Sequence, residues 1–242
     1  MPRWAPGDGV ARVLMVTAHP DDVDFGSAGT VAAFTDAGVE VAYCIATDGD
    51  AGGSDRAVSR AEMAALRQAE QRAAAAVVGV SDVTFLGYPD GRLQPTLELR
   101  RDISRVIRRF RPQRVITQSP ERNWERIYAS HPDHLAAGEA AACAVYPDDR
   151  NPFAHPELLE DEGLEPHTVD ELWLMAFADP NMAVDTTAAF DRKVAALLCH
   201  RSQVAERADL EKLLRDWGTG VARAVGLGDG AVAEAYHVVQ TR

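Results

Sequence analysis

Short apolar runs alternate with longer segments of helical periodicity along the first 145 residues. Four runs rich in valine and isoleucine are typical of strands buried on both faces: 11–17, 39–46, 83–86 and 115–117. Helices are predicted between and after them, over 29–37, 59–78, 99–110 and 135–145. This strand–helix alternation predicts an α/β fold with a mainly parallel sheet and helices on both of its faces.

The remainder of the chain is less regular. Residues 146–168 are rich in proline and acidic residues, so they are interpreted either as a substrate lid or as a solvated surface loop. Further strands are predicted at 169–177, 182–186 and 235–240, and further helices at 191–203 and 206–225. A length of 242 residues favours a single domain over 1–242, with its core at about 11–204 and a terminal helix and strand in 205–242.

Each of the first four predicted strands is followed by a polar loop. These loops are HPDD (19–22), TDGDAGG (47–53), GYPDG (87–91) and the segment that leads to HPDH (131–134). In open parallel sheets, ligands bind outside the carboxyl ends of the strands, near the point where the strand order reverses. The four loops therefore converge on one rim, where we expect an active site.

The two histidine-containing loops offer ligands for one metal ion. His19 and Asp22 are three residues apart in a loop stiffened by Pro20, and His134 begins the helix after the fourth strand. A catalytic zinc typically takes three nitrogen or oxygen ligands and keeps one position open. We therefore predict a Zn2+ site at His19, Asp22 and His134, which would also accept Fe2+, Co2+ or Mn2+.

The residues left over supply proton transfer. Asp21 and Asp22 cannot both be equivalent ligands because their charges repel, so Asp21 is predicted to be the general base. His131 is expected on the opposite side of the substrate carbonyl, where it would stabilise an oxyanion or protonate the leaving amine. Asp133 is expected to orient His131 or keep it charged.

Either loop alone is also explained by turns or helix N-caps, and only their combination at strand ends of one sheet favours a catalytic site. The other histidines lack such a context and are predicted to be surface or core residues: His155, His167, His200 and His237. Among these, His200 stands out because Arg-Ser-Gln follows it.

The overall charge restricts the class of partner. There are 25 Lys and Arg residues against 37 Asp and Glu, a net charge of -12, which argues against nucleic acid or an anionic membrane. The arginines of 100–114 could form a basic patch, but they are better interpreted as the solvent face of the helix 99–110.

Cysteines and apolar segments indicate the compartment. Cys44, Cys143 and Cys199 are odd in number and widely spaced, so we expect reduced, buried thiols, as in the cytoplasm. No apolar leader segment follows Met1, and no run approaches the roughly 18 apolar residues of a membrane span. A cytoplasmic location is therefore expected.

These motifs resemble those of a known family. Residues 17–30 (TAHPDDVDFGSAGT) are similar to the signature of the PIG-L/LmbE-like zinc-dependent de-N-acetylases, and HPDH at 131–134 resembles that family's second motif. Further matches lie at 47–53, 66–70, 86–91 and 200–203, so the resemblance covers about 11–204.

The resemblance implies a Rossmann-like three-layer sandwich with zinc at His19, Asp22 and His134, and the proton-transfer roles given above. By resemblance alone, Arg67 and Asp90 would contact sugar hydroxyls. The competing interpretations are a helix-surface Arg67 paired with Glu70, and a turn role for Asp90 in Pro-Asp-Gly. Relatives in this family often form trimers or hexamers, which implies a possible homo-oligomer.

The function predicted from the sequence is hydrolysis of the acetyl group of an N-acetylglucosamine-type small molecule by zinc-bound water. A non-catalytic metal- or sugar-binding module is the alternative, although binding alone does not require Asp21. A Rossmann-type nucleotide enzyme is less favoured, because no Gly-x-Gly-x-x-Gly follows the first strand.

Overall fold

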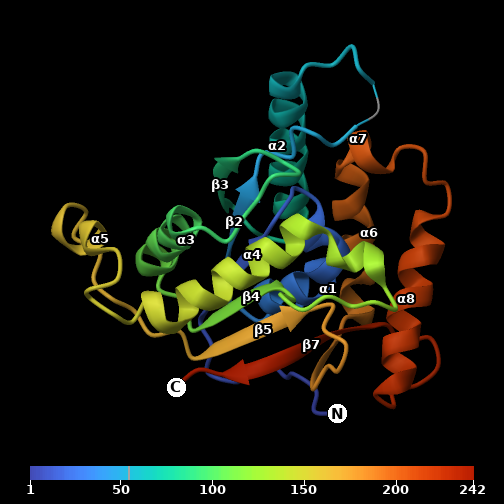
Figure 1. The fold of residues 1–242 in the computed structure, drawn as a ribbon. Helices are drawn as coiled ribbons and strands as arrows, with labels where there is room; N and C mark the ends of the chain where they lie inside the picture. Colours follow the sequence, from blue (N-terminus) through green and yellow to red (C-terminus); the bar gives the residue numbers. More distant parts are fainter. Residues whose placement is uncertain (54) are drawn as a thin grey trace.

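The computed structural model describes residues 1–53 and 55–242, in which seven strands form one sheet (Figure 1). The strands are β1 (Arg12–Thr17), β2 (Glu40–Thr47), β3 (Asp82–Tyr88), β4 (Arg114–Gln118), β5 (Glu171–Met175), β6 (Met182–Asp185) and β7 (Ala233–Gln240). The α-helices are α1 (Asp22–Asp36), α2 (Arg60–Val77), α3 (Leu97–Phe110), α4 (Pro132–Cys143), α5 (Pro156–Glu160), α6 (Phe190–Cys199), α7 (Arg201–Val204) and α8 (Leu210–Ala224). Shorter helical turns are η1 (Ile127–Ser130), η2 (Ala144–Asp148) and η3 (Thr187–Ala189).

The sheet has the strand order β3-β2-β1-β4-β5-β7-β6. β1 pairs in parallel with β2 on one side and with β4 on the other, and β3 and β5 extend the parallel part outward. β7 runs antiparallel to both of its neighbours, β5 and β6. The predicted mainly parallel sheet is confirmed, and the strand order reverses between β1 and β4.

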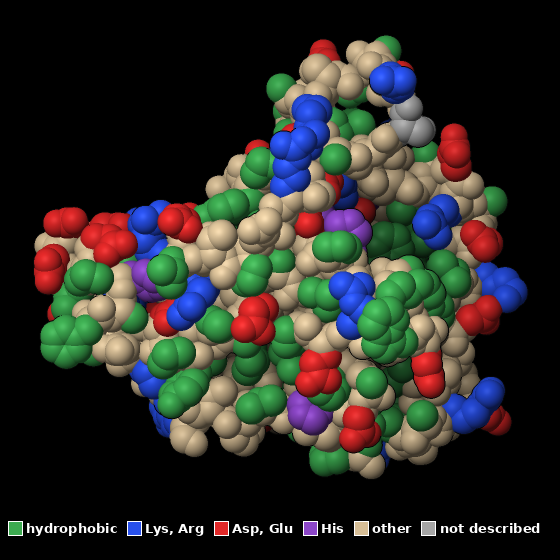
Figure 2. All heavy atoms as spheres, in the orientation of Figure 1, with side chains coloured by type: hydrophobic (Ala, Val, Ile, Leu, Met, Phe, Trp, Pro, Cys, Tyr) green, Lys and Arg blue, Asp and Glu red, His purple; other side chains and the backbone are tan. Residues whose placement is uncertain are grey.

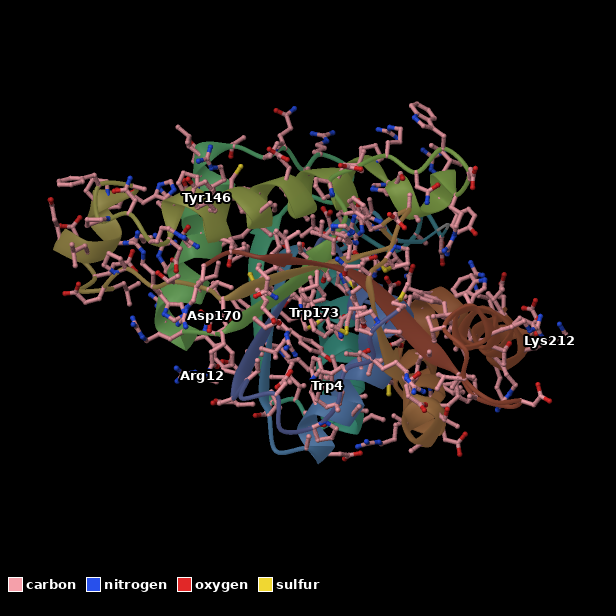
Figure 3. The ribbon with its side chains drawn as sticks, turned by 90° about the horizontal axis from the view of Figure 1, so that it is seen from below. Trp4, Arg12, Tyr146, Asp170, Trp173 and Lys212 are labelled. Carbon is pink, nitrogen blue, oxygen red and sulfur yellow. The ribbon has the colours of Figure 1, made fainter. Side chains whose placement is uncertain are left out.

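Side chains alternate between the two faces of the sheet and build two apolar layers. Met15, Tyr43 and Trp173 belong to the cluster that includes apolar residues of α1, α2 and α6. Leu14 and Leu174 belong to the opposite cluster, with apolar residues of α3 and α4. Seen from below, Trp173 lies inside the protein whereas Lys212 points outward from α8 (Figure 3). The expected three-layer arrangement is therefore present.

The first helix begins earlier than predicted. The sequence pattern placed its start at residue 29, but α1 starts at Asp22, because the Asp21 carbonyl accepts the first helical N–H groups of Asp24 and Phe25. Asp22 and Asp24 lie in the first turn, where negative charge is favoured by the helix dipole. The HPDD motif is thus the N-terminus of this helix.

The helices after β6 are also divided differently. The predicted helix 191–203 is interrupted at His200, whose backbone (φ -80°, ψ 57°) separates α6 from α7. The predicted helix 206–225 begins only at Leu210. The break at His200 turns the following residues towards α2.

Residues 146–168 lie far from the carboxyl ends of the strands. α5 projects at the opposite end of the sheet (Figure 1), and His167 contacts the Pro112 carbonyl just before β4. The position of residues 146–168 excludes a lid over the predicted active site.

Arg108 of α3 is buried, with Nε 3.3 Å from an Asp149 oxygen. The interpretation of Arg108 as part of the solvent face of this helix is therefore wrong.

The three cysteines are free thiols, of which Cys44 is buried. Cys143 and Cys199 are partly exposed, so the prediction of burial was wrong for these two, which lie near the ends of α4 and α6. Among the described residues, none of the helices combines the length and the apolar character needed to cross a bilayer.

Candidate active site

The two histidine motifs meet at the reversal point of the sheet. His19 follows β1 directly, while His131 and His134 lie at the start of α4, beyond the loop that leaves β4. Because β1 and β4 are adjacent and parallel, their carboxyl ends deliver both motifs to the same place. The ring centroids of His19 and His134 are 5.2 Å apart. The predicted convergence is therefore present.

Asp22 lies between two imidazole rings. Its Oδ2 is 3.3 Å from His19 Nδ1, and its Oδ1 is 3.0 Å from His134 Nε2. The second nitrogen of each ring has its own acceptor: His19 Nε2 is 3.2 Å from oxygens of both Asp133 and Asp90, and His134 Nδ1 is 3.3 Å from the Ala129 carbonyl. Such outer acceptors hold a proton on the ring nitrogen that points away from Asp22. The nitrogen that points towards Asp22 is then free to bind a metal.

These charges control the protonation of the two rings. Burial favours the neutral form of His19, but the carboxylates of Asp22, Asp133 and Asp90 together raise its pKa to about 12. Burial is likewise outweighed at His134, whose pKa is raised by Asp22. The pKa of Asp22 is in turn held well below its usual value by both histidines, despite burial. The pocket is thus arranged for positive charge beside Asp22.

The donor set His19–Asp22–His134 fits a divalent cation of the zinc class, which prefers imidazole and carboxylate ligands. Among the described residues, two groups that do not include Asp22 bring possible donor atoms within 4.8 Å of one another: His19, His131 and His134, and His19, Asp90 and Asp133. In the second of these, Asp90 and Asp133 already serve as acceptors for His19 Nε2. The predicted set His19, Asp22 and His134 keeps the acceptors of both rings in place, so these three residues stay the predicted ligands.

Asp21 is held in an unusual conformation beside these ligands. Its backbone is left-handed (φ 86°, ψ -23°), and its N–H donates to Gln71 Oε1 at 2.7 Å. Its carboxylate accepts from Arg67 Nη2 at 3.2 Å. Burial and the neighbouring charge of Asp22 raise the pKa of Asp21 to about 6, in spite of Arg67. A carboxylate with such a pKa can accept a proton near neutral pH.

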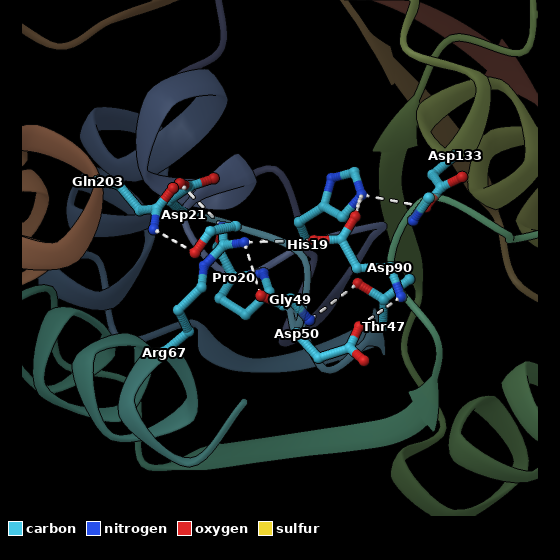
Figure 4. Close-up of polar contacts among 12 residues, drawn as sticks. His19, Pro20, Asp21, Thr47, Gly49, Asp50, Arg67, Asp90, Asp133 and Gln203 are labelled. Atoms are coloured by element: carbon cyan, nitrogen blue, oxygen red, sulfur yellow. Dashed lines mark hydrogen bonds and ion pairs between the residues drawn. The ribbon is translucent and has the colours of Figure 1, made fainter. Parts of the chain in front are cut away.

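Arg67 is buried in the site rather than exposed on α2. Only 4% of it is accessible, and its guanidinium donates to the carbonyls of Pro20 (2.6 Å) and Gly49 (3.1 Å) (Figure 4). A Cβ atom on Gly52 would lie 2.2 Å from Arg67 Nη1, so the glycines of TDGDAGG make room for this side chain. The interpretation of Arg67 as a helix-surface residue paired with Glu70 is excluded.

Asp90 faces the same cluster. Its Oδ1 is 3.2 Å from His19 Nε2 and its Oδ2 is 3.5 Å from Arg67 Nη1. Figure 4 shows His19 flanked by Asp90 and Asp133, with Arg67 on the side of Asp21. Asp90 is therefore more than a turn residue, and a contact from Asp90 or Arg67 to a sugar hydroxyl stays a prediction.

Contrary to the prediction, the side chain of Asp133 does not orient His131. The Asp133 backbone N–H donates to His131 Nδ1 at 3.1 Å, whereas the Asp133 carboxylate contacts His19 and accepts the N–H groups of Gly91 and Leu93. Burial and the neighbouring histidines lower the pKa of His131. A neutral His131 that accepts at Nδ1 carries its proton on Nε2, which leaves that nitrogen able to donate.

Three residues next to the site were missed as functional candidates. Gln71 bonds to Asp21, and its amide Nε2 donates to Asp24 Oδ2 at 2.8 Å. His200 Nε2 lies 2.8 Å from the same oxygen. The motifs at 66–70 and 200–203 were the available signal, but their proximity to HPDD depends on the packing of α2 against α6 and α7.

A cleft of about 1190 Å³ opens beside Asp22 and His134. Phe25, Met175, Phe177 and Trp217 contribute apolar walls, so the cleft extends from Asp22 and His134 to α8. Figure 2 shows hydrophobic side chains bordering a hollow between the segment 123–130 and α8. The cleft exceeds the range of about 300–1,000 Å³ common for small-molecule sites, so it has room for a substrate larger than one ring.

Several known proteins are similar to this chain in sequence and in structure. Residues 14–145 match the family described as PIG-L, GlcNAc-PI de-N-acetylase. Diacetylchitobiose deacetylase from Thermococcus kodakarensis is 35% identical over 205 residues, covering 83% of this chain and 73% of the relative. A probable N-acetyl-alpha-D-glucosaminyl L-malate deacetylase 2 from Bacillus anthracis is 30% identical over 221 residues, covering 88% and 90%. The solved structure of N,N'-diacetylchitobiose deacetylase from Pyrococcus horikoshii, complexed with its inhibitor MPG, is similar with a TM-score of 0.88 at 31% identity, covering 98% and 86%.

Proposed function

The chain belongs to the PIG-L family of de-N-acetylases, and we propose that it hydrolyses the acetamide of an N-acetylglucosamine-type small molecule with the help of a metal ion. Water adds to the acetyl carbonyl, the carbon–nitrogen bond breaks, and acetate and a free amine leave. The observation that carries the proposal is a proton-accepting carboxylate, Asp21, beside a donor set of two imidazoles and one carboxylate. A module that only binds metal or sugar has no use for that extra carboxylate.

The ligands for the metal would be His19, Asp22 and His134, and zinc is the ion we propose. Such a cation supplies a nucleophile at neutral pH by acidifying water, and it places positive charge near the carbonyl oxygen. The protein's task is to orient these ligands, which the outer acceptors Asp133, Asp90 and the Ala129 carbonyl support.

Asp21 and His131 move and hold the protons. Asp21 takes the proton of the attacking water, since its pKa of about 6 lies near neutrality. His131 donates from Nε2 to the developing oxyanion, because its Nδ1 is occupied by the Asp133 N–H. Protonated Asp21 then returns its proton to the departing amine.

The relatives differ in the group that carries the amide sugar, as their names state: a second sugar in diacetylchitobiose and malate in the malate deacetylase. The cleft that leads from Asp22 to Trp217 would hold this second group. The charged residues of its lining are balanced, so an uncharged group suits it better than an anionic one: the cations are Arg126, Lys193 and Arg207, and the carboxylates are Asp22, Glu125, Asp216 and Glu234. We therefore propose a disaccharide-like conjugate as the preferred substrate.

The test is acetate release from N-acetylglucosamine, diacetylchitobiose and N-acetylglucosaminyl malate. The protein is stripped with a chelator and reloaded with zinc before each assay. We expect activity that vanishes on stripping and returns with zinc, with the highest kcat/KM for the disaccharide. Stoichiometric zinc binding without acetate release from any of the three would refute the hydrolase, and a preference for the malate conjugate would refute only the uncharged second group.

A further inference from the structure

Behind Asp21 lies a chain of fully buried polar side chains. Asp24 and His200 have no accessible surface, and neither has Gln71. Gln71 Oε1 accepts the Asp21 N–H at 2.7 Å, Gln71 Nε2 donates to Asp24 Oδ2 at 2.8 Å, and His200 Nε2 lies 2.8 Å from that same oxygen. Four segments of the chain are thereby linked: α1, the loop before it, α2 and the α6–α7 junction.

The direction of each hydrogen bond in this chain is determined by its ends. The Asp21 N–H can only donate, and the Asp24 carboxylate can only accept when ionised, so the Gln71 amide has one satisfactory orientation. His200 must then donate from Nε2 to Asp24. If the Gln71 amide were rotated by half a turn, its NH2 group would face the Asp21 N–H and its oxygen would face the Asp24 carboxylate.

This arrangement acts on a strained residue. A left-handed backbone at a residue other than glycine is strained and persists only where its surroundings enforce it. Gln71 holds the Asp21 N–H, and Arg67 holds the Pro20 carbonyl and the Asp21 carboxylate. These two side chains lie one helical turn apart on the same face of α2. The position of α2 therefore sets where the Asp21 carboxylate points.

We propose that His200, Asp24 and Gln71 are positioning residues that hold Asp21 in its left-handed conformation and so place its carboxylate for proton transfer. The inference rests on the proposed function in that Asp21 is taken as the base. It gives the HRSQ segment a role in turnover, although His200 itself touches neither the metal ligands nor the cleft.

A neighbouring contact offers a matched control. Ser202 donates its N–H (2.8 Å) and its hydroxyl (2.6 Å) to Glu70, which also ties α2 to α7. In the described part of the chain Glu70 has no hydrogen bond to Asp21, so this link supports α2 without belonging to the chain that ends at the Asp21 N–H. A purely structural role for His200 predicts that His200 and Ser202 variants behave alike.

The experiment compares His200→Leu, Gln71→Leu, His200→Gln and Ser202→Ala in the zinc-loaded protein. For the two leucine variants we expect kcat to fall about 10–100-fold with KM and bound zinc nearly unchanged, because outer hydrogen-bond partners have effects of this size. His200→Gln keeps an amide donor near the position of Nε2 and should recover most of the rate. Ser202→Ala should lower Tm but retain kcat.

Hydrogen exchange supplies a readout that is independent of turnover. The Asp21 amide should exchange faster in a peptide covering 18–25 when Gln71 or His200 is replaced by leucine, and not in Ser202→Ala. If His200→Leu keeps the wild-type kcat, or loses it together with Ser202→Ala in proportion to stability, the positioning role is refuted. If Asp21→Asn itself keeps the wild-type rate, the assignment of the base fails instead.

Discussion

At the scale of single residues, two adjacent carboxylates point to different partners because one of them has a left-handed backbone. Asp21 has φ 86°, whereas Asp22 is the first residue of α1. Asp22 consequently faces His19 and His134, and Asp21 faces Arg67. Two like charges at neighbouring positions repel, and the turn between them directs each towards its own cationic partner.

Replacing Asp21 by asparagine tests the base without disturbing the backbone, since asparagine is one of the residues that tolerate the left-handed region. We expect kcat to fall by about 10²–10⁴-fold, the usual contribution of general acid–base catalysis, while zinc content stays at the wild-type level. Steady-state kinetics and metal analysis measure the two quantities. Near-wild-type turnover would show that another group accepts the proton.

At the scale of elements, α4 approaches the end of β4 closely enough to place His134. A Cβ atom built on Gly138 would lie 2.3 Å from the Gln118 carbonyl oxygen and 3.0 Å from the Pro120 nitrogen. Both neighbours are backbone, which cannot move aside as a flexible side chain can. The glycine thus sets the distance between α4, which carries His134, and the end of β4.

Gly138→Ala should therefore destabilise the protein although alanine is the better helix former. Overpacking of this kind costs about 1–3 kcal/mol, against a gain of up to about 1 kcal/mol in helix propensity. We expect Tm to fall by several degrees and zinc affinity to weaken. Gly220→Ala in α8 is the control, because nothing lies within 4 Å of its Cβ position, and Tm should stay or rise. Equal Tm changes in the two variants would contradict the close approach.

At the scale of the whole molecule, this acidic protein gathers several carboxylates around one buried histidine. The net charge is -12, yet His19 is surrounded by Asp22, Asp90 and Asp133 and has its pKa raised to about 12. The pKa of His134 is raised as well. Near pH 7 both rings are therefore expected to be protonated whenever no cation is bound.

Metal binding must then displace protons, so its affinity should depend on pH with a defined sign. Ligands with raised pKa values release protons when zinc binds, and the apparent Kd should fall about tenfold per pH unit for each proton released. When the pH is lowered from 8 to 6, we expect zinc to bind more weakly and to raise Tm by a smaller amount. Calorimetry in buffers of different ionisation enthalpy counts the protons. Binding without proton release would contradict this protonation state.

Much of the site was predictable because its residues lie in short motifs at strand ends. His19, Asp22 and His134 were predicted as ligands from their spacing, and the structure brings them together. The partner of the Asp133 carboxylate could not be inferred in this way. The Asp133 carboxylate lies near His19 because the loops that follow β3 and β4 meet at this edge of the sheet. This contact directs the carboxylate away from its sequence neighbour His131.

Local patterns in the sequence were enough to infer the mainly parallel sheet, the family and the two histidine motifs, since periodicity and short motifs are local properties. The folded chain was needed to show that α1 begins at Asp22, that Arg67 is buried and that His200 connects to Asp21 through Asp24 and Gln71. It likewise placed residues 146–168 away from the site. These features depend on contacts between segments far apart in the chain, and such contacts follow from packing rather than from any local pattern.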